Sequence, residues 1–255
     1  MLVAYTREVS PSLADCELTH LVRTPLDVAR AASEHEAYEA LLTRLGATVR
    51  RLPPQPTLPD AVFVEDTAVV LDEIAVITRP GAASRRAETA STAAALAAHR
   101  SLVHIQEPGT LDGGDVLVAG RRVFVGLSSR SNRVAIEQLD AVLRPLDYEV
   151  IPVRFGGCLH LKSCVTRMAD DLLLLNPDWV DVGAFPGYRA LLVDPAEPHA
   201  ANALALDGSV IHPLHFPRTR SRLEAEGLRV APVAMAELAK AEAGVTCCSL
   251  LLHES

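Results

Sequence analysis

A thiol, an imidazole and two groups of carboxylates are the side chains of this sequence best suited to chemistry. They are Cys247, His160, Glu65 with Asp66, and Asp112 with Asp115. A thiol beside a base can form covalent intermediates, and carboxylates bind a planar guanidinium through paired hydrogen bonds. Together these residues predict covalent chemistry on a cationic substrate, provided that the fold brings them to one place.

Some of these residues also have a purely structural interpretation. Cys247 lies in the apolar run 244–252, interpreted as a strand, and a cysteine in a strand is most often a small buried hydrophobe. Cys248 would then face the opposite side, and periodicity does not decide which thiol faces a site. His160 lies between two leucines, where a hydrogen-bonded structural role is the alternative.

The acidic and basic residues allow two interpretations as well. The stretch from Asp112 to Asp115 contains two glycines and is typical of a turn. Its carboxylates nevertheless stand directly before an apolar segment, where a buried charge needs a compensating cation. Arg85 and Arg130 follow the first two hairpins at equivalent places, either as surface arginines or as a paired clamp for a substrate carboxylate.

The residues indicate no cofactor site. Cys158, His160 and Cys164 are close in sequence, but their spacing matches no common structural zinc pattern. The pair Gly113-Gly114 belongs to neither of the common phosphate-binding glycine motifs. We therefore expect neither a metal nor an organic cofactor.

Helices and hairpins must position these residues. Apolar periodicity predicts helices over 27–45, 84–99, 131–144 and 217–226. Paired apolar segments around polar turns predict hairpins at 67–78, 115–127, 163–176 and 203–212. The polar residues that open them, Asp66, Asp115, Ser163 and Asn202, are spaced by 49, 48 and 39 residues, and Cys247 follows 45 later.

This recurrence predicts an α/β fold built from repeated units, each a hairpin followed by a helix. Repeats of this length favour radial closure, which would bring the first strand of every unit to a central channel. The alternative is an open α/β sheet, in which the reactive residues would meet only by accident. No linker or shift in composition divides residues 1–255, so we expect a single domain.

The composition excludes several classes of protein. The chain has 255 residues, a formal net charge of −8 and no basic block, so nucleic-acid binding is not expected. Five scattered cysteines do not form a secreted disulfide framework, and no signal-peptide pattern is apparent. The apolar runs are too short to cross a membrane. We expect a soluble, cytoplasmic protein that binds a small molecule.

Six segments, 63–66, 77–82, 111–117, 126–128, 159–163 and 246–249, together resemble the dimethylarginine dimethylaminohydrolase family. This family belongs to the guanidino-group-modifying superfamily. The resemblance implies a five-bladed α/β propeller of ββαβ units. It also implies hydrolysis of Nω-methylated arginines to citrulline and a methylamine through a covalent cysteine intermediate, without a cofactor. A homodimer remains open.

The resemblance also implies a role for each site residue. Cys247 is the nucleophile, His160 the acid and base, and Asp112 the group that orients His160. The implied substrate-binding residues are Glu65 and Asp66 for the guanidinium, Arg85 and Arg130 for the carboxylate, Leu18 and Asp60 for the amino-acid end, and Glu242. Glu242 is a departure, because the family usually has an aspartate five residues before the nucleophile.

Three other functions use similar residues. An arginine deiminase usually carries an inserted helical domain, for which this chain has no room. An amidinotransferase would pass the amidine group to an amine. A non-catalytic amino-acid sensor would be expected to lose the nucleophile or the base, and this sequence retains both. For the hydrolase, we expect Cys247 to be a poor nucleophile until a guanidinium is bound, because nearby carboxylates raise the pKa of a thiol.

Overall fold

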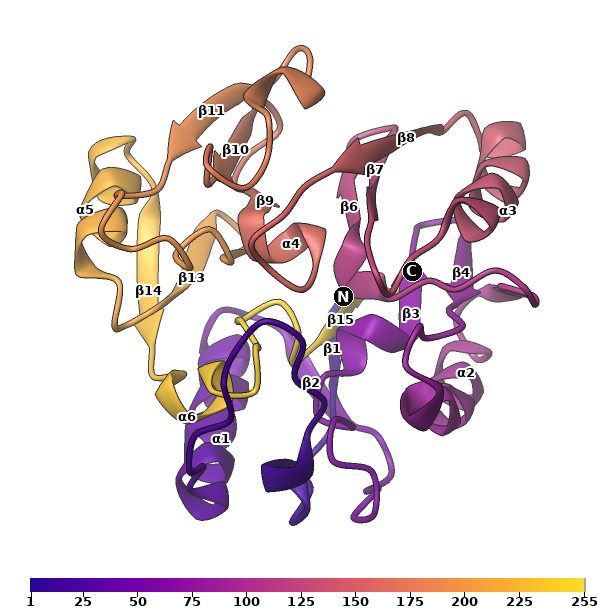
Figure 1. The fold of residues 1–255 in the computed structure, drawn as a ribbon, viewed down its shortest axis with the longest axis horizontal. Coiled ribbons are helices and arrows are strands. Elements are labelled where there is room, and N and C mark those ends of the chain that lie inside the picture. The colour runs from indigo at the N-terminus through magenta and orange to yellow at the C-terminus, as the bar shows by residue number, and fades with distance from the viewer. Residues whose placement is uncertain (255) are drawn as a thin grey trace.

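Five small sheets form a ring in the computed structural model, which describes residues 1–254 (Figure 1). Every sheet has three strands. Four sheets follow one another along the chain, and they are β3 (Ala68–Val70), β4 (Ile74–Ile77) and β5 (Ser101–His104); β6 (Val116–Ala119), β7 (Arg122–Leu127) and β8 (Glu149–Arg154); β9 (Val165–Arg167), β10 (Leu172–Leu175) and β11 (Arg189–Leu192); and β12 (Leu204–Leu206), β13 (Ser209–Pro213) and β14 (Arg229–Val233).

The fifth sheet joins the two ends of the chain. β15 (Leu250–His253) pairs antiparallel with β1 (Leu2–Thr6), which pairs parallel with β2 (Thr48–Arg51). In every sheet the first strand is antiparallel to the second and the second is parallel to the third. The closed ring predicted from the spacing is therefore confirmed, and the open sheet is not found.

The helices connect the second and third strands on the outside of the ring (Figure 1). They are α1 (Val28–Arg44), α2 (Thr89–Leu96), α3 (Arg133–Leu143) and α5 (Pro217–Ala225), close to the four predicted ranges. The Asp27 side chain caps α1 by accepting a hydrogen bond from Arg30 N at 3.0 Å. Gly46 follows the helix with a φ of +95°, a conformation that favours glycine.

The third unit, which contains β9, β10 and β11, lacks the expected helix. Between β10 and β11 the described residues contain only the 3-10 turn η6 (Val182–Ala184). Pro177, Gly183, Pro186 and Gly187 lie in this connection, and proline and glycine oppose helix formation. The prediction of one helix for each unit is wrong here.

Short turns precede the inner strands and carry most of the polar residues of interest. These are η2 (Val64–Thr67) before β3, η4 (Gly113–Asp115) before β6 and α4 (Leu161–Cys164) before β9. The remaining short elements are η1 (Leu13–Asp15), η3 (Ala83–Glu88), η5 (Arg144–Leu146) and α6 (Ala236–Ala239).

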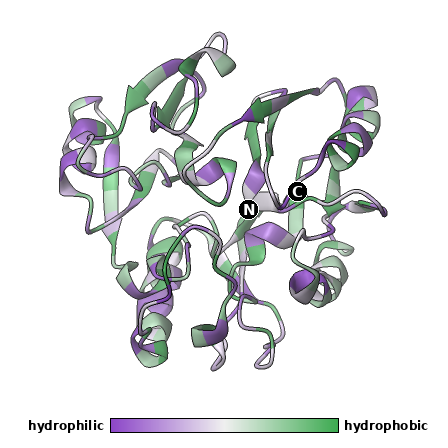
Figure 2. Cartoon of the chain, viewed as in Figure 1, coloured by the Kyte–Doolittle hydropathy of each residue, from purple (hydrophilic) through white to green (hydrophobic). Residues whose placement is uncertain are grey.

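One strand of each sheet faces a central channel. Residues of β3, β6, β9, β12 and β15 line a cavity of about 210 Å³ there. Around it, the strands are largely hydrophobic and the outer helices have mixed character (Figure 2). None of the helices in residues 1–254 has the length and apolar character needed to cross a membrane. The inner strands thus bring distant segments of the chain to one axis.

Candidate active site

The reactive side chains stand in the turns that lead into the inner strands. Asp66 lies in η2, Asp112 directly precedes η4, His160 directly precedes α4, and Cys247 lies in the turn before β15. Three of them, Asp66, His160 and Cys247, line one small cavity, and Asp112 contacts His160 from behind. The prediction that the ring brings these distant residues together is confirmed.

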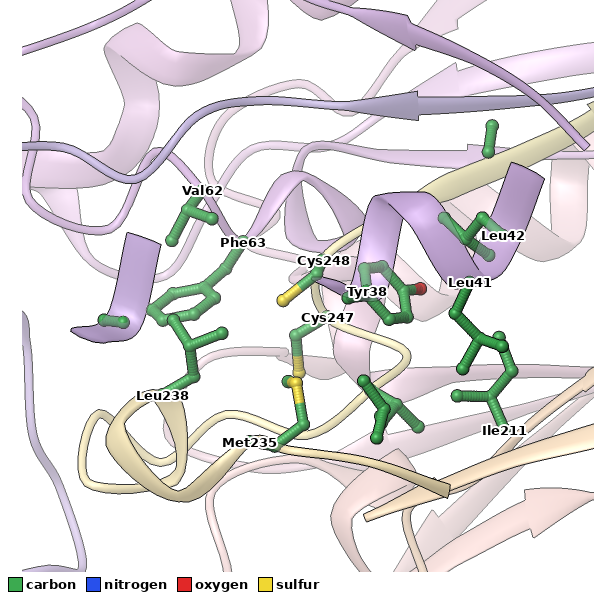
Figure 3. Close-up of a cluster of buried hydrophobic side chains, with 14 of the residues drawn as sticks. Tyr38, Leu41, Leu42, Val62, Phe63, Ile211, Met235, Leu238, Cys247 and Cys248 are labelled. Atoms are coloured by element: carbon green, nitrogen blue, oxygen red, sulfur yellow. The ribbon is translucent and has the colours of Figure 1, made fainter. Parts of the chain in front are cut away.

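Cys247 does not lie in a strand, contrary to the interpretation of the apolar run. Residues 245–248 form a turn, and the strand begins only at Leu250. The alternation of strand side chains therefore does not apply to the two cysteines. Cys247 and Cys248 are both buried and point in different directions (Figure 3). Of the two, Cys247 lines the cavity that contains His160.

His160 contacts two carboxylates and feels the charge of a third. Its Nε2 lies 3.0 Å from Asp112 Oδ2, and its Nδ1 lies 3.8 Å from Asp66 Oδ1. Burial opposes protonation of His160, but Asp66, Asp112 and Asp115 outweigh it and raise its pKa to about 10. At neutral pH the residue is therefore an imidazolium, which is the form that donates a proton.

Gly114 makes this arrangement possible. A Cβ atom at this position would lie 2.6 Å from His160 Nδ1 and 2.7 Å from Asp66 Oδ1, where no side chain fits. Its backbone N–H donates to Asp66 Oδ1 at 2.9 Å. The Asp-Gly-Gly-Asp stretch is a turn, and its second glycine, Gly114, lets an imidazole and a carboxylate approach the backbone closely.

Arg85 neutralises buried carboxylates. It is only 4% exposed, and its Nη1 donates to Asp66 Oδ2 at 2.6 Å. Its Nε and Nη2 donate to the two oxygens of Glu88 at 3.1 and 2.8 Å, and Nη2 also donates to the carbonyls of Asp60 and Phe63. Although Arg85 lines the cavity, few of its N–H groups are left for a substrate carboxylate.

Asp66 is ionised because of its neighbours. Burial by itself would raise its pKa, but the charges of His160 and Arg85 and the hydrogen bonds from Arg85 and Gly114 lower it to about 2. Asp66, Asp112 and His160 also offer ligand atoms within 4.8 Å of one another, as a metal site would. The ion pairs and hydrogen bonds already described account for this cluster.

Glu65 lines the central channel and contacts the backbone of Cys247. Its Oε1 accepts from Lys162 Nζ at 2.5 Å and its Oε2 from Thr246 Oγ1 at 2.8 Å. Its backbone N–H donates to the Cys247 carbonyl at 3.1 Å. The charge of Glu65 therefore reaches the site from the channel.

The Cys247 thiol is protonated in this environment. Burial and the negative charges of Glu65 and Asp66 raise its pKa to about 12, although a hydrogen bond from Gly244 N at 3.3 Å opposes the shift. A resting thiol with such a pKa is a weak nucleophile. A cation that neutralised the carboxylates of Glu65 and Asp66 would remove the charges that help to raise the pKa of Cys247.

Arg130 and Asp60 lie at the outer part of the cavity. The Arg130 side chain has one hydrogen bond, from Nη2 to Thr19 Oγ1 at 3.2 Å, so its guanidinium retains free donors. Burial raises the pKa of Asp60, and Arg85 opposes this rise. Leu18 does not line the cavity: its side chain packs against the apolar cluster that contains Cys247, and Glu17 lines the cavity instead.

Glu242 binds the loop over the site. Its Oε2 accepts from Thr19 N at 3.0 Å, and its Oε1 accepts from His20 N and Leu21 N, both at 2.5 Å. It adopts a φ of +59°, which is unusual for a side chain other than glycine, asparagine or aspartate. Glu242 also lines the catalytic cavity, so the expected contact to substrate stays a prediction beside this clasp on three consecutive amides.

Replacing Glu242 with glutamine is expected to loosen this clasp. Amide exchange at residues 19–21 should become about tenfold faster or more, because hydrogen bonds to a charged group contribute about 1.5–3 kcal/mol. KM should rise more than kcat falls. Glu226→Gln, at an exposed carboxylate paired with Arg189, is the control. Unchanged exchange at 19–21 with a raised KM would instead favour direct substrate contact.

Several supporting residues were not identified from the sequence. Glu88 holds Arg85, and the pattern Arg-x-x-Glu on a helical turn was its signal. Asn202 accepts from Thr246 N and donates to Thr246 Oγ1, both at 3.0 Å. Its signal was its place at the start of the fourth hairpin. Asp115, by contrast, was among the residues that the sequence indicated; it accepts from Leu161 N at 3.0 Å and so fixes the turn that follows His160.

The chain is similar in sequence and fold to known dimethylarginine dimethylaminohydrolases. The family model "N,N dimethylarginine dimethylhydrolase, eukaryotic" matches residues 24–183. The N(G),N(G)-dimethylarginine dimethylaminohydrolase of Streptomyces coelicolor is 38% identical, over 98% of this chain and 97% of its own. The Pseudomonas aeruginosa enzyme, solved as a cysteine-to-serine mutant with citrulline, superposes with a TM-score of 0.91 at 31% identity and 98% coverage of both chains. A histidine-to-glycine variant solved as an adduct with S-methyl-L-thiocitrulline superposes with a TM-score of 0.92 at 32% identity, covering 99% of this chain and 100% of its own.

Proposed function

This chain belongs to the dimethylarginine dimethylaminohydrolase family, and we propose that it hydrolyses Nω,Nω-dimethyl-L-arginine and Nω-monomethyl-L-arginine to L-citrulline and the corresponding amine. The observation that carries the proposal is the joint placement of Cys247 and a protonated His160 in one cavity. A nucleophile and a proton donor facing the same space are what cleavage of a guanidine C–N bond requires.

Binding follows from the charges of the cavity. The substrate guanidinium lies between the Cys247 thiol and the carboxylates of Asp66 and Glu65, whose negative charges it balances. Arg130 binds the α-carboxylate, and Asp60, with Glu17 beside it, faces the α-ammonium group. The positive charge of the substrate also favours loss of the thiol proton, so the substrate helps to activate its own nucleophile.

The chemistry proceeds in two halves. The Cys247 thiolate attacks the guanidine carbon, and the imidazolium of His160 gives its proton to the substituted nitrogen, which leaves as the amine. The carbon remains bonded to Sγ as a thiouronium. Neutral His160, oriented by Asp112, then takes a proton from water, which attacks the same carbon. The Cys247 thiolate leaves and citrulline is released.

A substrate comparison tests the proposed function. Citrulline release is measured with dimethylarginine, monomethylarginine and arginine. We expect turnover of both methylated substrates and a kcat/KM for arginine at least about tenfold lower, the discrimination that one or two methyl groups allow. Comparable kcat/KM values with arginine would indicate a deiminase instead. Binding of methylarginine without release of citrulline would indicate a sensor.

A further inference from the structure

A second cavity lies directly beside the catalytic one. Its volume is about 210 Å³, whereas the catalytic cavity has about 20 Å³, room for about one water molecule. The two cavities share Leu159, Glu242 and Ala243 in their linings. A single layer of side chains therefore separates them.

The lining of the second cavity suits an alkyl group or an amine. Its apolar side chains include Leu21, Leu159, Phe216, Met235, Ala239 and Ala243, and the imidazoles of His20, His199 and His215 also face it. Aromatic contacts fix two of these imidazoles: ring centroids are 4.8 Å apart for His199 and Trp179, and 4.1 Å apart for His215 and Phe216. Burial lowers the pKa of both histidines, so at neutral pH they are uncharged and do not repel a cation.

The second cavity also leads outward. Three of its lining residues, Leu21, His215 and Ala239, also line a depression at the surface together with Val22 and Lys240. The loop that Glu242 binds contributes His20 and Leu21 to the lining of the second cavity. A path from the common wall of the two cavities to solvent thus runs through the second cavity.

The position of the second cavity beside His160 matters for the leaving group of the reaction. The nitrogen that leaves must face His160, because His160 gives it a proton as the bond to the guanidine carbon breaks. Leu159, the preceding residue, belongs to the common wall of the two cavities. The second cavity is therefore the apolar space beside His160 that a substituent on the leaving nitrogen can enter.

We propose that the second cavity receives the Nω substituent of the substrate and then the released amine, so that the enzyme accepts Nω-alkyl arginines larger than methyl. This inference rests on the proposed function and names its substrate class. The carbon stays on Cys247, the amine carries the proton from His160, and no further reactant takes part.

The test compares Nω-methyl-, Nω-ethyl- and Nω-propyl-L-arginine as substrates. In the wild-type enzyme, kcat/KM should fall by less than tenfold from methyl to propyl. Ala239→Phe, which fills the second cavity away from the catalytic one, should lower kcat/KM at least tenfold for propyl and less than twofold for methyl. Ala236→Phe is the matched control, because Ala236 lies on the same helix and lines only the surface depression.

Two results would overturn the inference. One is a fall of 100-fold or more from methyl to propyl in the wild-type enzyme, a comparison that needs no variant to fold. The other is an equal loss for methyl and propyl in Ala239→Phe. Either result leaves the proposed function standing if methylarginine still yields citrulline. A wild-type enzyme that releases no citrulline from methylarginine contradicts the proposed function itself.

Discussion

Replacing Cys247 with serine is expected to lower kcat for methylarginine by about 10⁴-fold or more, since a hydroxyl cannot replace the thiolate as nucleophile or leaving group here. Citrulline release measures this loss. Cys248→Ser is the control, because Cys248 is fully buried and does not line the cavity that contains His160. It should lose stability but keep most of its kcat. Equal losses of kcat in the two variants would contradict the assignment of Cys247.

We expect the Cys247 thiol to react only slowly with alkylating reagents when no ligand is bound. With a pKa of about 12, only about 10⁻⁵ of it is thiolate at pH 7, and alkylation should become about tenfold faster for each pH unit up to about pH 10. A slowly reacting guanidine ligand neutralises the charges of Glu65 and Asp66 and should speed alkylation of Cys247 at pH 7. Identical rates with and without this ligand would rule out activation by the substrate.

Replacing Arg85 with glutamine is expected to destabilise the fold by about 3–5 kcal/mol, because it leaves the buried carboxylates of Asp66 and Glu88 without their cation. For a chain of this size the melting temperature should fall by about 10 °C or more, measured by calorimetry. Activity should fall as well, since Asp66 contributes to the raised pKa of His160.

Arg130→Gln is the informative comparison for this prediction. The Arg130 guanidinium is held by one hydroxyl, so its loss should leave the melting temperature within a few degrees of the wild type. KM should rise instead, because the substrate carboxylate loses its main cation. If Arg85→Gln kept its stability and only raised KM, the two arginines would act as the paired clamp that the sequence predicted.

The repeated unit of this protein can be recognised in the sequence alone. The intervals between Asp66, Asp115, Ser163, Asn202 and Cys247 record a repeated unit, and a repeat is a local property that a single sequence displays. It was sufficient to predict the closed ring and the convergence of the reactive turns. The missing helix of the third unit had a local signal as well, in the prolines and glycines between β10 and β11.

The sequence alone did not predict which side chains form ion pairs and hydrogen bonds with one another. The sequence predicted a clamp formed by Arg85 and Arg130, but it did not indicate the ion pairs of Arg85 with Asp66 and Glu88. Nor did it indicate that the Glu242 carboxylate binds the amides of residues 19–21, more than 200 positions away. Such partners depend on how turns from different sheets pack. The separation of two residues along the chain does not predict whether their polar atoms come within the roughly 3 Å of a hydrogen bond.

The sequence by itself determined the residue types, their spacing and thus the ring that gathers a thiol, an imidazole and several carboxylates. Only the tertiary structure decided which thiol faces His160, which charges hold it protonated, and where an Nω substituent has room. The physical reason is that pKa shifts, clasps and cavities arise from distances and burial among segments that meet only after the ring has closed.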